Sequence, residues 1–222
     1  MTWLGAAAVI ARKDIRLEAR TRDVVSSVGL FVLVVVVTAS LALPLQGPGR
    51  EGMAAGVLWM AFLFAGLLGL GRSMAIEAED GCLAGLLVSP APRESIFLGK
   101  LVSNLALTGC VEVLIVPLFI AILQLQVEAP ALLVASIVLG TLGILTVGTL
   151  FAAIAVGTRG GEAILPLLVL PVSVPIVIAA VKTTEAAFLG AGAVLGWLLL
   201  MGGFDALFLL VALATFPYVT EG

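Results

Sequence analysis

Apolar residues fall into six long blocks along the chain, separated by shorter polar or turn-rich segments. A helix of about 20 apolar residues crosses the roughly 30 Å hydrocarbon core of a bilayer, because each residue adds about 1.5 Å. The pattern therefore predicts six transmembrane helices, of which the last is long enough to be broken. The predicted spans are approximately residues 24–43, 53–71, 97–123, 130–156, 162–181 and 187–216, and the segments between them are residues 46–51, 72–94, 124–129, 157–162 and 182–185.

The first 23 residues carry apolar and basic positions on opposite sides of a predicted helix. The apolar side contains Trp3, Leu4, Ala7, Ala8, Ala11, Ile15 and Ala19, and the basic side contains Arg12, Lys13, Arg16, Arg20 and Arg22. This pattern is typical of a helix that lies in the membrane interface against anionic headgroups. The alternative is a signal peptide cleaved near residue 42. It is disfavoured because residues 24–43 exceed an ordinary h-region and further spans follow.

The composition supports a single transmembrane domain, residues 1–222. Hydrophobic residues make up 62% of the chain and charged residues 11%, with a mean hydropathy of +1.27, whereas soluble domains are about 45–50% apolar. The net charge of −3 disfavours a nucleic-acid-binding surface, which carries a concentrated basic excess. Histidine is absent, so this chain alone cannot supply His ligands to zinc or to haem iron.

Basic residues are distributed unequally between the two sides of this topology. One side carries nine of the 11 Lys and Arg residues, and the other carries only Arg50 and Lys182. The nine are Arg12, Lys13, Arg16, Arg20, Arg22, Arg72, Arg93, Lys100 and Arg159. Positive residues near span ends are retained in the cytoplasm, so both termini are predicted to be cytoplasmic.

The connection after the second span, residues 72–94, is too polar at its start to cross a bilayer and too apolar at its end to be an ordinary solvated loop. Leu83, Leu86 and Leu87 fall at helical spacing, and Pro90 and Pro92 end the helix. Acidic residues precede it, where the helix macrodipole favours them. The pattern predicts a short helix in the cytoplasmic plane that docks into a partner's groove.

Motifs in this connection and elsewhere resemble the CcmB family, the haem exporter protein B of cytochrome c maturation. They are Gly56-Val57-Leu58-Trp59, Arg72, Glu79-Asp80-Gly81-x-Leu83, Leu86-Leu87, Ser89-Pro90-x-Pro92, Gly99-Lys100-Leu101, Arg159-Gly160-Gly161 and the stretch from Leu168 to Pro175. The resemblance covers almost the whole chain. One departure falls in the connection: where the family commonly has Ser-Leu-Glu-Gln, this chain has Cys82-Leu83-Ala84-Gly85, which removes a carboxylate and an amide from the expected ATPase contact.

The resemblance implies an all-α, ABC-2-like permease of the cytoplasmic (inner) membrane, needed for haem export or for release of the haem-loaded chaperone in c-type cytochrome biogenesis. It implies a CcmA-like ABC ATPase that supplies ATP hydrolysis, a CcmC-like haem-handling membrane protein and a CcmE-like haem chaperone as partners. Haem would be a substrate and not a resident cofactor. The connection would be the coupling helix, with its ATPase contacts at Glu79, Asp80, Gly81, Leu83, Leu86, Leu87, Ser89 and Pro90. The alternative is an ABC-2-type permease that exports a lipid, a polysaccharide or a drug.

Two carboxylates fall near the middle of predicted spans, Glu112 in the third and Asp205 in the sixth. A charged group at the bilayer centre costs about 2.5–3.5 kcal/mol on translocon scales. We therefore expect both in the bundle interior or in a wet location. Their functional role would be to line a substrate path or to hydrogen-bond a partner helix. The alternative is that they are uncharged residues that only link neighbouring helices.

Other residues within the spans have a structural and a functional interpretation. Pro166, Pro171 and Pro175 remove backbone donors from the fifth span, which allows a kink for a conformational cycle or only a static fit to neighbouring helices. Trp59 lies away from the usual interfacial belt and serves packing, ligand stacking or subunit contact. Three spacings of small residues, Gly52–Gly56, Ser136–Gly140 and Gly192–Gly196, are interpreted as close packing within the chain.

Other functional classes are poorly supported. The chain contains no GxxxxGK[ST] motif, so it cannot hold nucleotide phosphates by that route. An intramembrane enzyme is disfavoured because there is no GxSxG motif, no histidine and no paired carboxylates within one span. A channel or secondary transporter would need polar relay residues in several spans, and only Glu112 and Asp205 qualify.

Overall fold

The computed structural model describes residues 3–43, 47–79, 92–156, 161–190 and 192–219. Its helices are α1 (Trp3–Thr21), α2 (Asp23–Ala42), α3 (Arg50–Glu79), α5 (Arg93–Leu123), α6 (Pro130–Val156), α7 (Gly161–Leu189) and α8 (Leu195–Val219). Six of them are long and apolar enough to cross a membrane, namely α2, α3, α5, α6, α7 and α8. The predicted all-α membrane fold with six spans is confirmed, and the chain is a multi-pass membrane protein.

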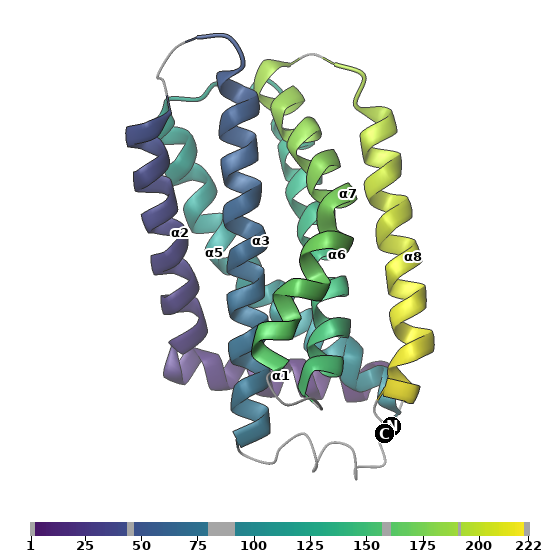
Figure 1. Cartoon of the computed structure of the whole chain (residues 1–222). Coiled ribbons are helices and arrows are strands. Elements are labelled where there is room, and N and C mark those ends of the chain that lie inside the picture. The colour runs from purple at the N-terminus through teal and green to yellow at the C-terminus, as the bar shows by residue number, and fades with distance from the viewer. Residues whose placement is uncertain (1–2, 44–46, 80–91, 157–160, 191, 220–222) are drawn as a thin grey trace.

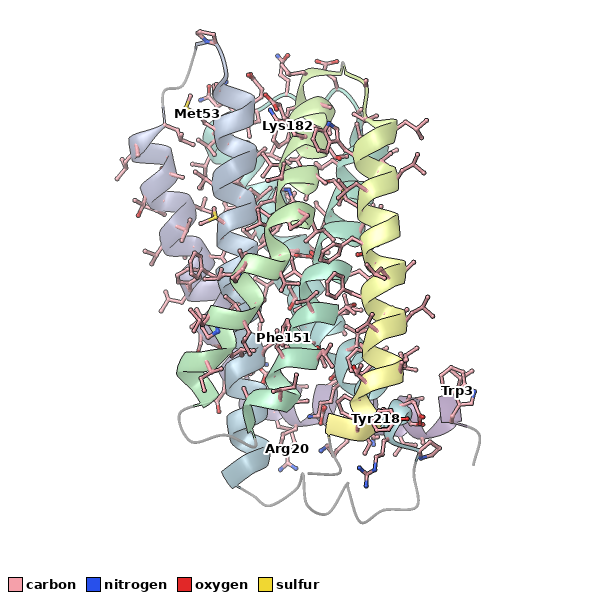
Figure 2. The ribbon with its side chains drawn as sticks, turned by 45° about the vertical axis from the view of Figure 1, so that its right-hand side comes forward. Trp3, Arg20, Met53, Phe151, Lys182 and Tyr218 are labelled. Atoms are coloured by element: carbon pink, nitrogen blue, oxygen red, sulfur yellow. The ribbon has the colours of Figure 1, made fainter. Side chains whose placement is uncertain are left out.

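The six spanning helices lie side by side, and α1 lies crosswise over one end of the bundle (Figure 1). This end, called the α1 end below, also holds the last residues of α3 and α8 and the first residues of α5 and α7. Trp3 and Tyr218 are exposed there, and Lys182 lies at the opposite end (Figure 2). Exposed aromatic residues at the end of a bundle are typical of the membrane interface, so α1 has the position expected of an interfacial helix.

The turn from α1 into α2 takes a single residue. Arg22 has a φ of 57°, in the left-handed region, and the next residue begins α2. Of the helix predicted over residues 1–23, the part from Trp3 to Thr21 is confirmed, but the side that packs on the bundle differs from the predicted apolar side. Ala7 and Ala11 are buried as expected, whereas Trp3 and Leu4 are exposed and Ile10 is buried instead. The reason is that α1 packs mainly on α5, where Ile10 lies directly against Gly99.

The predicted boundary between the fifth and sixth spans is wrong. Residues 182–185 were expected to be a connection because they carry Lys182 and Glu185, but α7 continues through them to Leu189. The helix ends where Gly190 adopts a φ of 66° and its N–H bonds to Ala186 O at 2.9 Å, a common way for a helix to stop. The last helix then starts at Leu195, eight residues later than predicted, and is continuous.

The second predicted connection also begins later than expected. Residues 72–79 continue α3 without a break, so the helix extends two turns beyond the apolar span that ends at Gly71. At the other end of the connection, α5 begins at Arg93, four residues before the predicted start of the third span. The remaining part of the connection, residues 80–91, lies outside the described residues.

Large side chains fill the interior where small residues let helices approach. Trp59 of α3 is 0% exposed and lies over Gly140 of α6, and a Cβ on Gly140 would lie 2.1 Å from the indole ring. The indole N–H donates to Thr184 Oγ1 of α7 at 2.9 Å, and Ser136 Oγ lies 2.9 Å from the same oxygen and donates to Ala180 O. This network joins α3, α6 and α7 in the centre of the bundle.

The three small-residue spacings have different outcomes. Ser136 and Gly140 both pack inside the chain, as predicted, through the contacts just described. Gly52 lies against the Glu185 carboxylate, but a Cβ on Gly56 or Gly196 would meet no atom within 4 Å. Gly192 lies outside the helices with a φ of 132°. Only the Ser136–Gly140 spacing therefore packs at both of its positions.

We predict that Gly140→Ala destabilises the protein by about 1–3 kcal/mol, because a methyl group there overlaps the Trp59 ring and overpacking costs about this much. Thermal unfolding of the solubilised protein measures the change. Gly56→Ala is the matched control and should not lower the melting temperature, since its Cβ would meet open space and alanine is favoured over glycine inside a helix. Equal stability of Gly140→Ala and wild type would contradict the packing described here.

Candidate functional site

The predicted coupling residues lie in or next to the connection between α3 and α5. Glu79 is the last residue of α3, and Pro92 and Arg93 follow the connection. The others lie outside the described residues, namely Asp80, Gly81, Leu83, Leu86, Leu87, Ser89 and Pro90. Because α3 ends and α5 begins at the α1 end (Figure 1), the chain leaves and re-enters the bundle on the side that carries the interfacial helix.

A buried ion pair joins α1 to α5 beside this connection. Lys100 Nζ lies 2.8 Å from Asp14 Oδ2, and their side chains are 3% and 11% exposed. Ser103 Oγ is within 3.3 Å of the same carboxylate oxygen and also donates to Lys100 O. A buried charge without its partner is strongly destabilising, so the pair holds α1 in one position on α5.

The backbones of α1 and α5 also touch closely at this point. A Cβ on Gly99 would lie 2.7 Å from Ile10 Cβ and 2.9 Å from Ala7 O. Since a backbone atom cannot move aside as a flexible side chain does, only glycine fits at this crossing. The glycine lets α5 approach α1 closely enough for Lys100 to reach Asp14.

A second acidic residue of α1 holds the beginning of α2. Glu18 is 6% exposed, and its Oε1 accepts a hydrogen bond of 2.8 Å from the backbone N–H of Val25. The first N–H groups of a helix have no hydrogen-bond partners within the helix, and the positive end of the helix macrodipole also stabilises a carboxylate placed there. α1 is therefore anchored at two points, by Asp14 to α5 and by Glu18 to α2.

Sequence analysis missed Asp14, Glu18 and Lys100 as a connected group. A signal was present, because Asp14 and Glu18 are four residues apart and so share one side of an otherwise basic helix. Their partners could not be identified from the pattern, since Lys100 is 86 positions away from Asp14 in the chain.

The two carboxylates within the spans have different surroundings. Glu112 of α5 is buried, and its Oε1 accepts a hydrogen bond of 2.5 Å from Thr141 Oγ1 of α6. Asp205 of α8 is also buried, but neither of its oxygens finds a hydrogen-bond partner among the described residues. Both lie inside the bundle as expected from the cost of charge in lipid, and Glu112 alone is seen to link two helices.

Trp59, Pro171 and Pro175 do not gather with these carboxylates into one pocket. Trp59 is enclosed by the network with Thr184 described above, so ligand stacking on its ring would require α3 to move. Pro171 and Pro175 lie on the exposed side of α7, and α7 changes direction part of the way along its length (Figures 1 and 2). The proline side therefore faces lipid or a partner.

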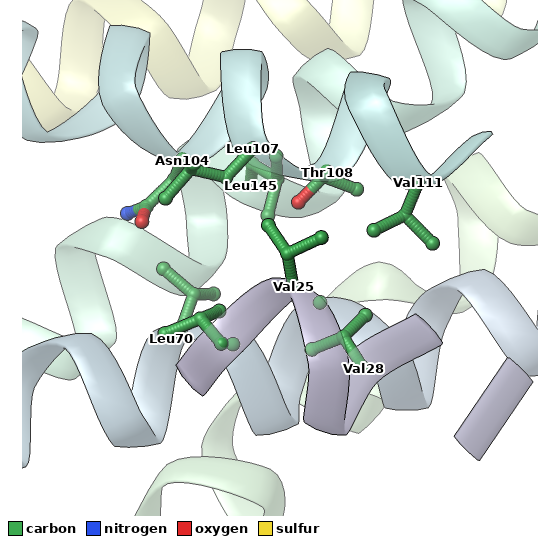
Figure 3. A pocket seen from close by; sticks show the side chains of 11 residues that line it. Val25, Val28, Leu70, Asn104, Leu107, Thr108, Val111 and Leu145 are labelled. Atoms are coloured by element: carbon green, nitrogen blue, oxygen red, sulfur yellow. The ribbon is translucent and has the colours of Figure 1, made fainter. Parts of the chain in front are cut away.

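A narrow crevice lies between α2, α3, α5 and α6, with about 300 Å³ of empty space including its open mouth. Its walls are mainly valine and leucine, with Asn104 and Thr108 as polar members (Figure 3). Asn104 is buried, and its Nδ2 has no hydrogen-bond partner among the described residues. The space inside is close to that of one water molecule, and an amide and a hydroxyl are two of the partners such a water needs. The crevice is too narrow for a large ligand without helix movement.

Across the described ranges, no group of three or more Asp, Glu, Cys or His side chains is placed to hold a metal ion. The polar groups that are present instead connect helices: Asp14 with Lys100, Glu18 with the start of α2, and Glu112 with Thr141. Such contacts link α1 to α5 and α2, and α5 to α6.

Comparisons with known proteins agree on one family. Residues 5–220 match the family model described as CcmB protein. The chain is 37% identical to the heme exporter protein B of Rhodobacter capsulatus over 166 residues, which is 75% of this chain and 76% of the relative. It is 34% identical to that of Paracoccus denitrificans over 179 residues, covering 81% and 82% of the two chains. The same name belongs to a relative from Haemophilus influenzae that is 29% identical over 178 residues, or 80% of each chain.

We predict that removing one partner of the Asp14–Lys100 pair destabilises the protein by up to about 3–5 kcal/mol, because the remaining side chain loses a 2.8 Å ion-pair contact inside the protein. Asp14→Leu and Lys100→Met are the single changes. The double variant should recover most of the loss, since it leaves neither charge behind. Thermal unfolding in detergent measures all three variants.

The Lys182–Glu185 pair provides the control, because its lysine is 51% exposed. Lys182→Met should cost no more than about 1 kcal/mol, as is usual for a surface ion pair. A double variant of Asp14 and Lys100 that loses the sum of the two single losses would show that the two side chains do not depend on each other.

Proposed function

The chain belongs to the CcmB family, and from this premise we propose that it is the permease subunit of an ABC transporter required for haem export or holo-chaperone release in c-type cytochrome biogenesis. The observation that carries the proposal is the family match over residues 5–220, which includes all six spans. The relatives named heme exporter protein B support haem as the substrate class. A bundle of six helices is the architecture such a subunit needs.

A separate ATPase provides the energy in this proposal. The chain has no GxxxxGK[ST] motif, so an ABC ATPase of the CcmA-like kind binds and hydrolyses ATP. It docks at the α1 end on the connection between α3 and α5, through Glu79, Asp80, Gly81, Leu83, Leu86, Leu87, Ser89 and Pro90. A short acidic and leucine-rich segment of this kind suits a groove in a partner.

The α1 end is the cytoplasmic end in this proposal. The sequence places nine of the 11 basic residues on that side, and positive residues are retained in the cytoplasm. Both chain termini are then cytoplasmic, and the membrane is the inner membrane of the cell. This orientation puts the connection between α3 and α5 on the side where ATP is available.

Movement passes from the ATPase into the spans through the contacts at the α1 end. The connection joins α5 at Arg93, and Arg93 Nη1 donates to Pro217 O of α8 at 3.1 Å. Two turns further along α5, Lys100 is paired with Asp14 of α1. A displacement of the connection therefore acts on α5, α1 and α8 together.

The remaining partners handle haem on either side of this step. A CcmC-like haem-handling membrane protein and a CcmE-like haem chaperone are the partners we propose, with haem or the haem-loaded chaperone as cargo. Haem would be a passing substrate, and the chain would hold no resident cofactor. Glu112, Asp205, Trp59, Pro171 and Pro175 are the residues proposed for translocation or subunit contact.

The first test is co-purification. Gently solubilised tagged protein should bring down an ATPase subunit. Deletion of the gene for this chain should abolish peroxidase-stained c-type cytochromes, and haem-loaded chaperone should accumulate.

Asp80→Lys should reduce the recovered ATPase to roughly a tenth or less, since like charges at an interface cost several kcal/mol. Glu51→Lys, at the opposite end of α3, is the control and should leave recovery unchanged. A wild-type chain that purifies alone would contradict the proposal, and so would Asp80→Cys labelled only from outside the cell.

The second test concerns Glu112. If it contributes to export, Glu112→Leu should reduce mature cytochrome c and ATPase stimulation several-fold, and Glu112→Gln should reduce them less. Thr141→Val is the matched control, because it removes the same hydrogen bond between α5 and α6 and keeps the carboxylate. Unchanged function in both Glu112 variants would exclude a role for this residue in export.

A further inference from the structure

Asp205 is an acidic residue that is buried in the bundle and has no hydrogen-bond partner in the described part of the chain. The residue is 6% exposed, and both carboxylate oxygens are buried with no hydrogen-bond donor among the described residues. Burial of a polar group without a hydrogen bond destabilises a protein, because the group loses the hydrogen bonds that it makes with water. The arrangement seen here is therefore destabilised at this position, in contrast to Glu112, which has Thr141 as its donor.

The carboxylate faces a seam between three helices. A Cβ on Gly143 of α6 would lie 2.5 Å from Asp205 Oδ1 and 2.0 Å from Ile176 Cδ1 of α7. Asp205 therefore lies opposite a glycine, with apolar side chains beside it. α6 contains no charged residue, and the charged residues of α7 are Glu162, Lys182 and Glu185, near its ends. The surrounding helices offer no counter-charge at this level.

α8 is also the spanning helix that the chain buries least. Only 17% of the most apolar 18-residue stretch of α8 is buried, compared with 56% of the corresponding stretch of α6. Among its polar contacts are a 3.8 Å approach of Thr183 Oγ1 to Met201 Sδ near one end and the Arg93 bond to Pro217 O at the other. Gly190 and Gly192, both with positive φ, lie in the segment that leads into it. These features allow α8 to shift as a unit relative to α6 and α7.

We propose that the seam between α6, α7 and α8 opens to water during the transport cycle, and that Asp205 is the residue whose hydration stabilises the open arrangement. The inference rests on the proposed function, because the cycle is driven by the partner ATPase. In the closed arrangement the carboxyl group finds no donor among the residues that the structure describes, whereas in the open one water supplies its hydrogen bonds. Asp205 thus opposes closure and favours opening.

Asp205 is poorly suited to bind the cargo directly. Haem carries two propionate groups, and a carboxylate repels them at short range. A role in opening the seam needs only a group that water can hydrate. If Asp205 acts through its hydration, a neutral polar residue can replace it. If Asp205 acts by binding a charged group, a neutral residue cannot replace it.

Substitutions that remove polarity and those that keep it separate these roles. Asp205→Leu should raise the melting temperature by about 2 °C or more, since about 1 kcal/mol shifts it by about 2–4 °C in a chain of this size. The same variant should lower cytochrome c maturation to about a tenth or less, because the open state loses its stabilising group. Asp205→Asn should keep at least about half of the activity.

Each other outcome would overturn the inference. An Asp205→Leu protein with wild-type activity would show that the seam opens without a polar group or not at all. Failure of Asp205→Leu to accumulate in the membrane would show that the closed arrangement needs the carboxylate. Equal loss in the Asn and Leu variants would show that hydration is not the requirement.

Opening is measured directly at Ile176, which is 0% exposed in the seam. In a chain with Cys82→Ser and Cys110→Ser, Ile176→Cys should react with a small water-soluble thiol reagent during ATP turnover and not without ATP. Val32→Cys, equally buried in α2 away from the seam, should stay unreactive in both conditions. An unreactive Ile176→Cys during turnover would overturn the inference.

Co-purification of the ATPase is measured in the same preparations. If the wild-type chain recovers no ATPase, the proposed function is refuted. If it recovers the normal amount of ATPase but Ile176→Cys stays unreactive, only this inference is refuted.

Discussion

Inside the hydrocarbon core of a bilayer, no water is available to hydrogen-bond a polar group. Each spanning helix meets this constraint for its own backbone, and the side chains must meet it by pairing across helices. Trp59 with Thr184, Ser136 with Ala180 O, and Glu112 with Thr141 are such pairs. They tie α3, α5, α6 and α7 into one unit. α8 contributes Asp205, whose carboxylate oxygens find no hydrogen-bond partner among the described residues, as is also true of Asn104 of α5, Thr149 of α6 and Ser173 of α7. Asp205 is the acidic side chain among these four.

The α1 end meets a different constraint, because charged groups are common there and must be paired wherever they are buried. Asp14 and Lys100 form their ion pair across a crossing that only Gly99 permits, and Glu18 binds the first turn of α2. α1 is thus attached to both neighbouring spans. In the proposed permease, a push from an ATPase on the connection between α3 and α5 reaches α1 and the spans through these rigid contacts.

The two intramembrane carboxylates illustrate why similar residues can have different roles. Both were expected in the interior on the same energetic argument, and both are buried. The difference comes from the helix opposite: α6 presents Thr141 to Glu112 but Gly143 to Asp205. A hydroxyl satisfies the first carboxylate, whereas a glycine lets the second approach closely and offers no donor from its side chain. Glu112 therefore links α5 to α6 in this arrangement, whereas Asp205 lies in the seam that we propose to open.

The sequence by itself determined the class of fold, the number of spans and the family, because a membrane helix satisfies its own backbone and its apolar length can be counted along the chain. It also predicted the interfacial helix, but not which side of it packs, and charges at Lys182 and Glu185 suggested a loop where Gly190 actually ends the helix. Only the tertiary structure decided which polar residues are paired. Asp14 and Lys100, or Glu112 and Thr141, lie far apart in the chain, and their meeting depends on how helices cross, which hydrophobic periodicity does not specify.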